Sequence, residues 1–318
     1  MRARWVVVMG VAACSGGTEQ VDGKVADDVT GVTDTVVGFE DFIDLADAPD
    51  ISGDGACFTP GADWASTTWL TQDVAPGESG ALSGLVEDFE SGDAVDVPAT
   101  VQLWYSDDAS GTSDASATTD VSGIVAFDAV PSCQTMTYKV TTDPLLDETK
   151  TTFKAHQVYS PPAGGTIAGA TFLSVSSTTY QLIPSILGVS IDDDKAVIAG
   201  TAFDCTRDPS LPTDDDSGKI EGAQVIVYDE NGQIPPSLTV NYFVDDFPNR
   251  DQLHTSPDGL WVASNVPPGN LRVEMWAKVA GTPTLLGATQ ILSEAGSINI
   301  ANIFTGYGDG VKFPTVCE

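Results

Sequence analysis

The feature that most constrains the fold of this chain is an internal repeat. Residues 119–131 align without gaps on residues 255–267, at an offset of 136 positions. Both copies start with threonine, place a glycine four positions later, continue with a short apolar run and close on a Val-Pro pair. Upstream, residues 97–103 match residues 221–227 in kind. A chain that carries the same strand-and-turn pattern twice is predicted to contain two related folding units.

Each part of the repeat has a mechanical role. The segments Gly84–Asp88 and Gly200–Asp204 share a Gly-x-x-x-Asp pattern, which predicts a strand that ends in an acceptor able to close a turn. Gly123 and Gly259 supply the positive φ of a hairpin turn, and the polar residue before each glycine can cap it. The Val-Pro pair marks a strand end, because proline cannot donate to a ladder and keeps the preceding residue extended.

Short β-rich runs separated by Gly, Pro, Asp and Ser fill most of the chain after residue 57. Residues 100–105 and 224–228 alternate apolar and other side chains with a period of two, as expected for strands. The regular spacing of strands and turns predicts an all-β fold made of two tandem antiparallel β-sandwich domains. Residues 176–189 are apolar but include Pro184, so we expect only a short helical turn there, packed between the domains.

The charge of the chain excludes one class of partner. Acidic residues number 46 and basic residues 13, which gives a formal net charge of −33. Such a surface repels phosphate, so no nucleic acid is expected to bind. Hydrophobic residues make up 42% of the chain, which is enough to form real cores.

The first residues predict export. Arg2 and Arg4 precede a nine-residue apolar run, residues 5–13, which is too short to cross a membrane and is typical of a secretory signal peptide, residues 1–13. The run ends in Val-Ala-Ala-Cys at residues 11–14, which resembles the lipobox of bacterial lipoproteins.

The lipobox resemblance implies cleavage before Cys14 and attachment of palmitate-like acyl chains to its sulfur, which would anchor the protein in a membrane. Ser15 follows the cysteine, and the absence of aspartate at that position resembles the pattern of lipoproteins sent to the outer membrane. The alternative is an ordinary signal peptide with an unmodified Cys14.

Residues 14–56 predict an acidic flexible tether. Residues 15–56 contain eleven acidic residues and one basic residue, Lys24, without a sustained helical or strand period. Such a segment buries too little apolar area to offset the entropy of ordering, and its like charges repel. One apolar cluster is an exception and could form a short docked helix. Its members are Phe39, Phe42, Ile43 and Leu45.

The repeat resembles the carboxypeptidase regulatory-like domain, a transthyretin-like (prealbumin-like) seven-stranded sandwich. The resemblance covers about 60 residues around each copy, and residues 265–269, Asn-Val-Pro-Pro-Gly, preserve the closing turn of that family. The first copy has Ser132-Cys133 in place of Pro-Gly, so its turn type stays open. The resemblance implies a first domain at residues 57–190 and a second at 191–318, both transthyretin-like or immunoglobulin-like. It also implies a non-catalytic structural or binding role.

The cysteines predict disulfide bonds. With Cys14 acylated, an even number remains in an exported chain, and three pairings are possible. We expect the pairing that keeps each bond within one copy of the repeat, because it closes the ends of each domain and stabilises each by about 4 kcal/mol. The expected bonds are Cys57–Cys133 and Cys205–Cys317. A zinc site is disfavoured because the chain has no Cys-x-x-Cys motif.

Binding residues are weakly indicated. Carboxylates are the donors that calcium prefers, and acidic runs supply weak calcium candidates, although solvated turns explain the same runs. The calcium candidates are Asp192, Asp194, Asp214 and Asp216. Trp64 and Trp69 precede the first repeat and are weak candidates for stacking on a carbohydrate, whereas Trp104 and Trp261 lie in repeat strands and are expected in the core or on a sheet face.

No enzymatic motif stands out. His156 and His254 are the two histidines of the chain, and no sequence motif for hydrolysis, a metalloprotease or a phosphate-binding loop surrounds them. We therefore predict a non-enzymatic, membrane-anchored lipoprotein that presents two sandwiches as a structural, adhesive or binding surface to an envelope protein or polysaccharide. The alternatives are a carbohydrate-binding or calcium-dependent binding protein of the cell envelope, and a secreted enzyme. No cofactor is expected unless calcium binds.

Overall fold

The computed structural model describes residues 43–52, 79–146, 148–159, 164–204, 207 and 217–305. The described part is almost entirely β-structure with one helix, which confirms the predicted all-β class. Ten strand pairs in this part are antiparallel, as predicted, and four are parallel. The elements are β1 (Ser79–Asp88), β2 (Ala99–Trp104), β3 (Ala115–Thr118), β4 (Ile124–Pro131), β5 (Gln134–Thr142), β6 (Thr149–Lys150), β7 (Thr152–Tyr159), β8 (Thr166–Ser176), α1 (Ser177–Leu187), β9 (Ala196–Phe203), β10 (Gln224–Tyr228), β11 (Thr239–Val244), β12 (Phe247–Asn249), β13 (Leu260–Val266), β14 (Gly269–Val279), β15 (Thr282–Ser293), β16 (Ile298–Ile300) and β17 (Ile303–Phe304).

The sequence repeat reappears as a repeated pattern of strand pairing. In the first half of the chain, β1 pairs with β4 antiparallel and with β8 parallel, while β5 pairs with both β2 and β7. In the second half, β9 pairs with β13 antiparallel and with β16 parallel, while β14 pairs with both β10 and β15. Each half therefore contains two facing sets of strands connected in the same order.

The glycine that opens each Gly-x-x-x-Asp segment allows two backbones to approach closely. A Cβ atom on Gly84 would lie 2.3 Å from the carbonyl oxygen of Ala170, and one on Gly200 would lie 1.8 Å from that of Ala301. Both distances are too short for a real side chain, so glycine is required. At the end of the first segment, Oδ1 of Asp88 accepts from the amides two and three residues later, at 3.1 and 2.9 Å, which confirms the predicted turn closure.

The glycines of the two repeat turns have the predicted conformation, but the turns are not of the predicted hairpin type. Gly123 and Gly259 have φ of 77° and 65°, as expected. Neither turn joins two paired strands, so they are not hairpin turns. In the first copy the cap is Asp120, whose Oδ1 accepts from the amides of Ser122 and Ile124 at 2.8 and 3.0 Å. In the second copy, the residue before the glycine provides the cap as predicted.

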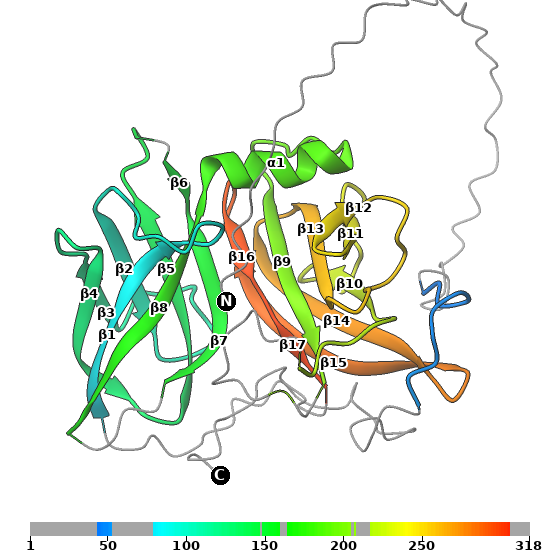
Figure 1. Cartoon of the computed structure of the whole chain (residues 1–318), viewed down its shortest axis with the longest axis horizontal. Helices are drawn as coiled ribbons and strands as arrows, with labels where there is room; N and C mark the ends of the chain where they lie inside the picture. The colour runs from blue at the N-terminus through cyan, green and yellow to red at the C-terminus, as the bar shows by residue number, and fades with distance from the viewer. Residues whose placement is uncertain are drawn as a thin grey trace, which may run out of the picture. The chain divides into compact units, whose positions relative to one another are not determined.

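One sheet runs through both halves of the described chain (Figure 1). The short strand β16 lies parallel between β7 of the first half and β9 of the second, and Asn299 pairs with Phe153 on one side and Ile198 on the other. The strand order is β12-β11-β13-β9-β16-β7-β5-β2-β3, with β17 also pairing with β9. The boundary expected after residue 190 falls between α1 and β9, and the sheet continues across it. The division into two separate domains stays a prediction.

The segment between the halves forms a longer helix than the sequence predicted. α1 covers eleven residues and contains Pro184. Its start is capped by the hydroxyl of Ser176, which accepts from the amide of Thr179 at 3.0 Å, and its end by Gly188 with φ of 69°. α1 is held by tertiary packing, because Leu187 lies in a buried cluster with residues of β9, β13 and β16.

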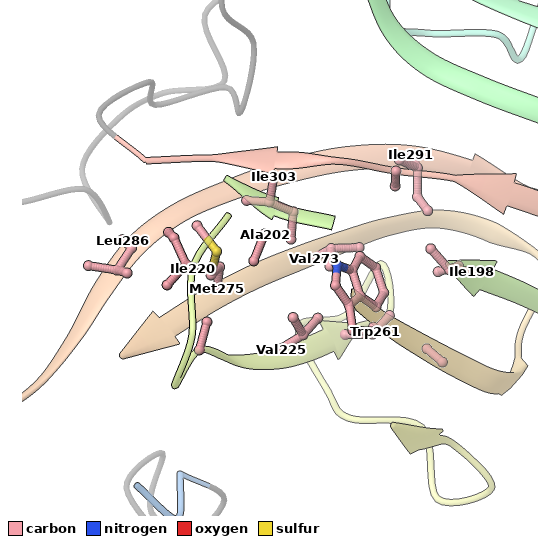
Figure 2. Close-up of a cluster of buried hydrophobic side chains, with 14 of the residues drawn as sticks. Ile198, Ala202, Ile220, Val225, Trp261, Val273, Met275, Leu286, Ile291 and Ile303 are labelled. Atoms are coloured by element: carbon pink, nitrogen blue, oxygen red, sulfur yellow. The ribbon is translucent and has the colours of Figure 1, made fainter. Parts of the chain in front are cut away.

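Each half has its own hydrophobic core. The core of the second half contains Trp261, whose side chain is 1% exposed and points between the two sets of strands (Figure 2). Ile198, Val225 and Val273 surround the indole ring in this core. The core of the first half is a separate cluster formed mainly by β1, β2, β4 and β5. This burial confirms that Trp261 is a core residue.

Candidate functional site

A polar cluster centred on His156 connects the two halves. The register between β5 and β7 shifts at this point, so that two residues of β7 lie opposite one residue of β5. His156 is one of the two and has a positive φ of 56°, which is unusual for a residue other than glycine. Such a β-bulge changes the direction of a side chain. The imidazole of His156 contacts Thr289 and Gln290 of β15 and Asp107 of the loop after β2.

The cluster contains the residue types of a hydrolase triad, an acid, a histidine and a hydroxyl, but its geometry does not suit proton transfer from the hydroxyl to the histidine. Nδ1 of His156 lies 3.0 Å from Oδ1 of Asp107, and Nε2 contacts the hydroxyl of Thr289. Nε2 also lies 2.8 Å from the carbonyl oxygen of Gln290. Because a carbonyl can only accept, the contact with Gln290 fits a ring whose Nε2 holds a proton, and such a ring cannot take a proton from threonine. Thr289 is also fully buried. The geometry fits a structural connection between β7 and β15.

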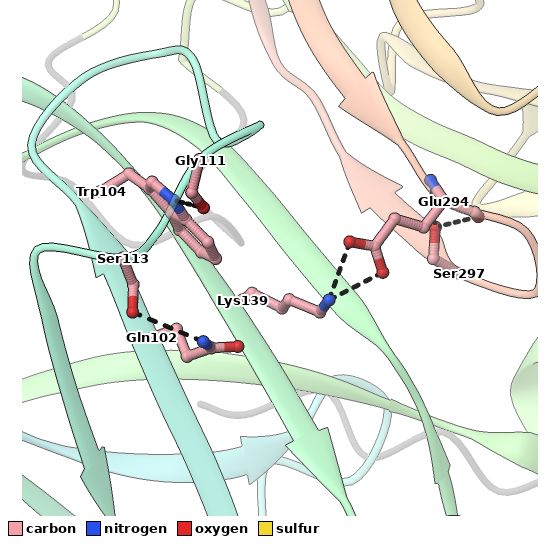
Figure 3. A network of polar contacts seen from close by, with 7 residues as sticks. All are labelled: Gln102, Trp104, Gly111, Ser113, Lys139, Glu294 and Ser297. Atoms are coloured by element: carbon pink, nitrogen blue, oxygen red, sulfur yellow. Dashed lines mark hydrogen bonds and ion pairs between the residues drawn. The ribbon is translucent and has the colours of Figure 1, made fainter.

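A second polar network also joins the halves (Figure 3). Nζ of Lys139 on β5 lies 2.8 and 2.7 Å from the two carboxylate oxygens of Glu294, which follows β15. The hydroxyl of Ser297 donates to the carbonyl oxygen of Glu294 at 2.7 Å and fixes this loop. The Lys139 ammonium also lies 5.0 Å from the ring centre of Phe153. This arrangement combines an ion pair with a cation–π contact.

An apolar contact lies next to these polar networks. Trp104, Ala109 and Phe153 of the first half form a buried cluster, and Leu292 of β15 packs against it. The indole N–H of Trp104 donates to the carbonyl oxygen of Gly111 at 2.9 Å. The junction between the halves therefore has an apolar contact, an ion pair and a continuous sheet.

Residues 44–52 form a docked segment, of which the sequence indicated only Leu45 as part of a docked cluster. It lies in the predicted tether, and Leu45, Ala48 and Ile51 are 3 to 4% exposed. The amide of Ile51 donates to the carbonyl oxygen of Lys278 at 2.9 Å. Residues 43–52 contain bends and one β-bridge and no helical turn. Phe39 and Phe42 lie outside the described residues, so the short docked helix suggested for their cluster stays a prediction.

Asp50 holds this segment to the turn between β14 and β15. Its carboxylate accepts from the amides of Ala280 and Gly281, at 3.0 and 2.6 Å, and from the amide of Ser52 at 3.0 Å. These hydrogen bonds, those from Ser52 first, lower the pKa of Asp50 from 3.8 to about 2, because they stabilise the charged form.

The lowered pKa of Asp50 predicts how docking responds to acid. Because the folded pKa lies below the unfolded value, the contribution of Asp50 is complete above about pH 4 and is lost as the pH falls through 2. Hydrogen exchange of the Ile51 amide between pH 5 and pH 2 measures this loss, and the amide of Val140, in the other core, reports general unfolding. Asp50→Asn should remove the pH dependence at Ile51. An Ile51 amide that stays as protected as Val140 down to pH 2 would contradict this prediction.

A cavity of about 440 Å³ lies beside the start of α1. Four carboxylates line it, together with the hydroxyl groups of Ser91, Thr149 and Ser176. The carboxylates belong to Asp88, Asp93, Asp96 and Glu148. In the part of the chain that the structure describes, neither these residues nor any others form a group of three or more ligands able to hold a metal ion.

The structure places few of the binding residues that the sequence suggested. Asp192 and Asp194 are exposed in the turn before β9, where the carboxylate of Asp194 pairs with the ammonium of Lys195 at 3.1 Å. Five further candidates lie outside the described residues: Cys14, Trp64, Trp69, Asp214 and Asp216. His254 contacts Gln252 and the carbonyl oxygen of Thr255.

The structure describes only one of the four cysteines for which disulfide bonds are predicted. Cys133 has a φ of 57°, so it takes the positive-φ conformation in the closing turn of the first copy, and it is disulfide-bonded. Cys57, Cys205 and Cys317 lie outside the described residues, so both predicted pairings stay predictions.

Comparisons with known proteins give little further information. No family model matches the chain, so the resemblance to the carboxypeptidase regulatory-like domain stays a prediction, and no curated protein matches it. The shaft pilin SpaA from Lactobacillus rhamnosus GG is similar at 9% identity over 72% of this chain and 99% of its own, with a TM-score of 0.21. The minor pilin GBS52 of Streptococcus agalactiae is similar at 9% identity over 71% of this chain and 95% of its own, also with a TM-score of 0.21.

The Bacillus anthracis TIE protein is similar at 15% identity over 72% of this chain, with a TM-score of 0.23. This chain covers 34% of that solved chain. All three TM-scores are below 0.5, so these similarities carry no argument about function. Within the described residues, no helix has the length and apolar character needed to cross a membrane.

Proposed function

We propose that the chain is an exported, non-enzymatic protein of the bacterial envelope, anchored by lipid on Cys14. Its β-sandwich halves act together as one structural or adhesive module. The outer membrane is the proposed location.

The observation that carries the structural role is the sheet that continues through both halves. β16 is hydrogen-bonded to β7 and to β9, so the halves cannot tilt apart without breaking one of its two backbone ladders. The Lys139–Glu294 ion pair and the contact of Leu292 with Phe153 support the same junction. A rigid junction suits a protein that presents both halves as one continuous surface.

The charge and the docked segment also support this role. A net charge of −33 is repelled by anionic lipid headgroups, which favours a module held away from the membrane surface. Residues 44–52 attach the chain from the anchor side directly to the β14–β15 turn, so the anchor is connected to the second half.

Metabolic labelling with a palmitate analogue tests the anchor. The parent protein should carry the label and fractionate with membranes, whereas Cys14→Ser should lose the label. Ser15→Ala is the matched control and should keep it, because the neighbouring side chain accepts no lipid. Equal labelling of Cys14→Ser and the parent would contradict the proposal.

A further inference from the structure

The docked segment 44–52 occupies a surface with the features of a peptide-binding site. It forms a parallel bridge between Asp50 and Lys278, a residue of β14. The amide of Ile51 donates to the Lys278 carbonyl oxygen at 2.9 Å, and the Lys278 ammonium donates to the carbonyl oxygen of Ala46 at 3.0 Å. Backbone pairing of this kind is how many domains add an extended peptide to a sheet.

The surface also recognises particular side chains. The carboxylate of Asp50 accepts from two consecutive amides of the β14–β15 turn, where Ala280 and Gly281 have φ of 51° and 76°. Consecutive amides in such a turn form a small anion-binding concavity. Ile51 is buried in the core of the second half, and Pro49 fits against Gly222, where an added Cβ would lie 2.6 Å from the proline ring.

The segment and the surface that it contacts are far apart in the sequence. Asp50 and its partners in the turn are separated by 230 and 231 positions. With the expected Cys57–Cys133 bond reduced, residues 53–78 join the segment to β1 and can span at most about 90 Å when fully extended. A second copy of the chain can then place the same segment on this surface.

We propose that the surface made by β10 and the β14–β15 hairpin is a binding site for an extended acidic peptide, and that residues 44–52 of a second copy occupy it by reciprocal exchange. Exchange follows mass action, so it increases with the concentration of copies. The charge of −33 on each copy opposes it, so exchange increases with ionic strength. This site goes beyond the proposed function and does not rest on the lipid anchor.

The first experiment tests the site itself in the full chain carrying Cys14→Ser. A protease recognition sequence is inserted between residues 53 and 56, ahead of Cys57, so that a Cys57–Cys133 bond cannot hold the pieces together; the protein is cleaved, and the two pieces are separated by size-exclusion chromatography. We expect the N-terminal piece to stay bound and to be displaced by a labelled synthetic peptide of residues 44–52. Immediate loss of the cleaved piece together with no binding of the labelled peptide would overturn the proposal.

Paired variants test the recognition. Asp50→Ala should weaken binding of the peptide at least about tenfold, because charge-assisted hydrogen bonds to two amides are lost. Asp47→Ala is the matched control: it removes the same charge from an exposed residue of the same segment and should leave binding unchanged. Equal weakening by both variants would mean that only overall charge matters and would overturn the site.

Exchange between copies is measured by native mass spectrometry. In a reducing buffer, a mixture of 15N-labelled and unlabelled full chains carrying Cys14→Ser should form mixed dimers, more of them at higher ionic strength, and excess peptide should dissociate them. Asp50→Ala chains should stay monomeric. Mixed dimers that persist in Asp50→Ala, or their absence in the parent at every salt concentration, would overturn the exchange. Neither result depends on the lipid or on an adhesive partner.

Discussion

Gly200→Ala should lower the free energy of unfolding by about 2–3 kcal/mol, the cost of forcing a side chain into a closely packed backbone contact. The added Cβ would lie 1.8 Å from the carbonyl oxygen of Ala301, so the chain after β16 would have to move away from β9. Urea unfolding followed by circular dichroism measures this loss.

Gly111→Ala is the matched control for Gly200→Ala. Nothing lies within 4 Å of a Cβ at Gly111, and its φ is not positive, so the variant should stay within about 0.5 kcal/mol of the parent. A Gly200→Ala protein that is as stable as Gly111→Ala would mean that β9 and the chain after β16 do not approach as closely as the structure shows.

Trp261→Ala should lower the free energy of unfolding by about 3–5 kcal/mol, the usual cost of removing a large buried aromatic side chain. Trp261 is almost completely buried in the core of the second half, where its removal leaves a cavity between the two sets of strands (Figure 2).

Trp261→Phe separates the packing of this residue from its polar group. Within the described part of the chain, the indole N–H of Trp261 is buried without a hydrogen-bond partner. Trp261→Phe removes this unpaired donor and keeps an aromatic ring in the core. It should therefore lower the free energy of unfolding by less than half as much as Trp261→Ala does. Equal losses in both variants, measured by denaturant unfolding, would indicate that the indole makes a polar contact essential to the core.

The sequence predicted the repeating parts of this fold well, because each has a local cause. The positive φ of Gly123 and Gly259 follows from the absence of a side chain, and the strands of each copy follow from alternating apolar residues. From the sequence, Gly200 was predicted only to begin a strand. The actual reason for glycine there is the approach of a backbone about 100 residues later, which no local pattern reveals.

The junction could not be predicted for a similar reason. β16 is a three-residue strand, Ile-Asn-Ile, which is too short to stand out from the surrounding sequence. It becomes a strand because two edges, β7 and β9, are available on either side of it. His156 reaches β15 only because of a bulge in β7, and a bulge depends on the partner strand as much as on its own residues.

The docked segment shows how a compositional argument can miss a local exception. The acidic residues around it predicted a tether, but Leu45, Ala48 and Ile51 follow one another at intervals of three in an extended segment with bends. This spacing matches neither a strand nor a sustained helix. The hydrogen bonds of Asp50 that hold it come from a turn more than 200 positions away.

Residue-resolved hydrogen exchange in increasing denaturant tests most directly whether β16 makes the two halves one cooperative unit. We expect the amides of β5 and β7 in the first half and those of β9 and β13 in the second to open at the same denaturant concentration and with the same free energy. Opening of the second half while β5 and β7 keep their full protection would contradict this account.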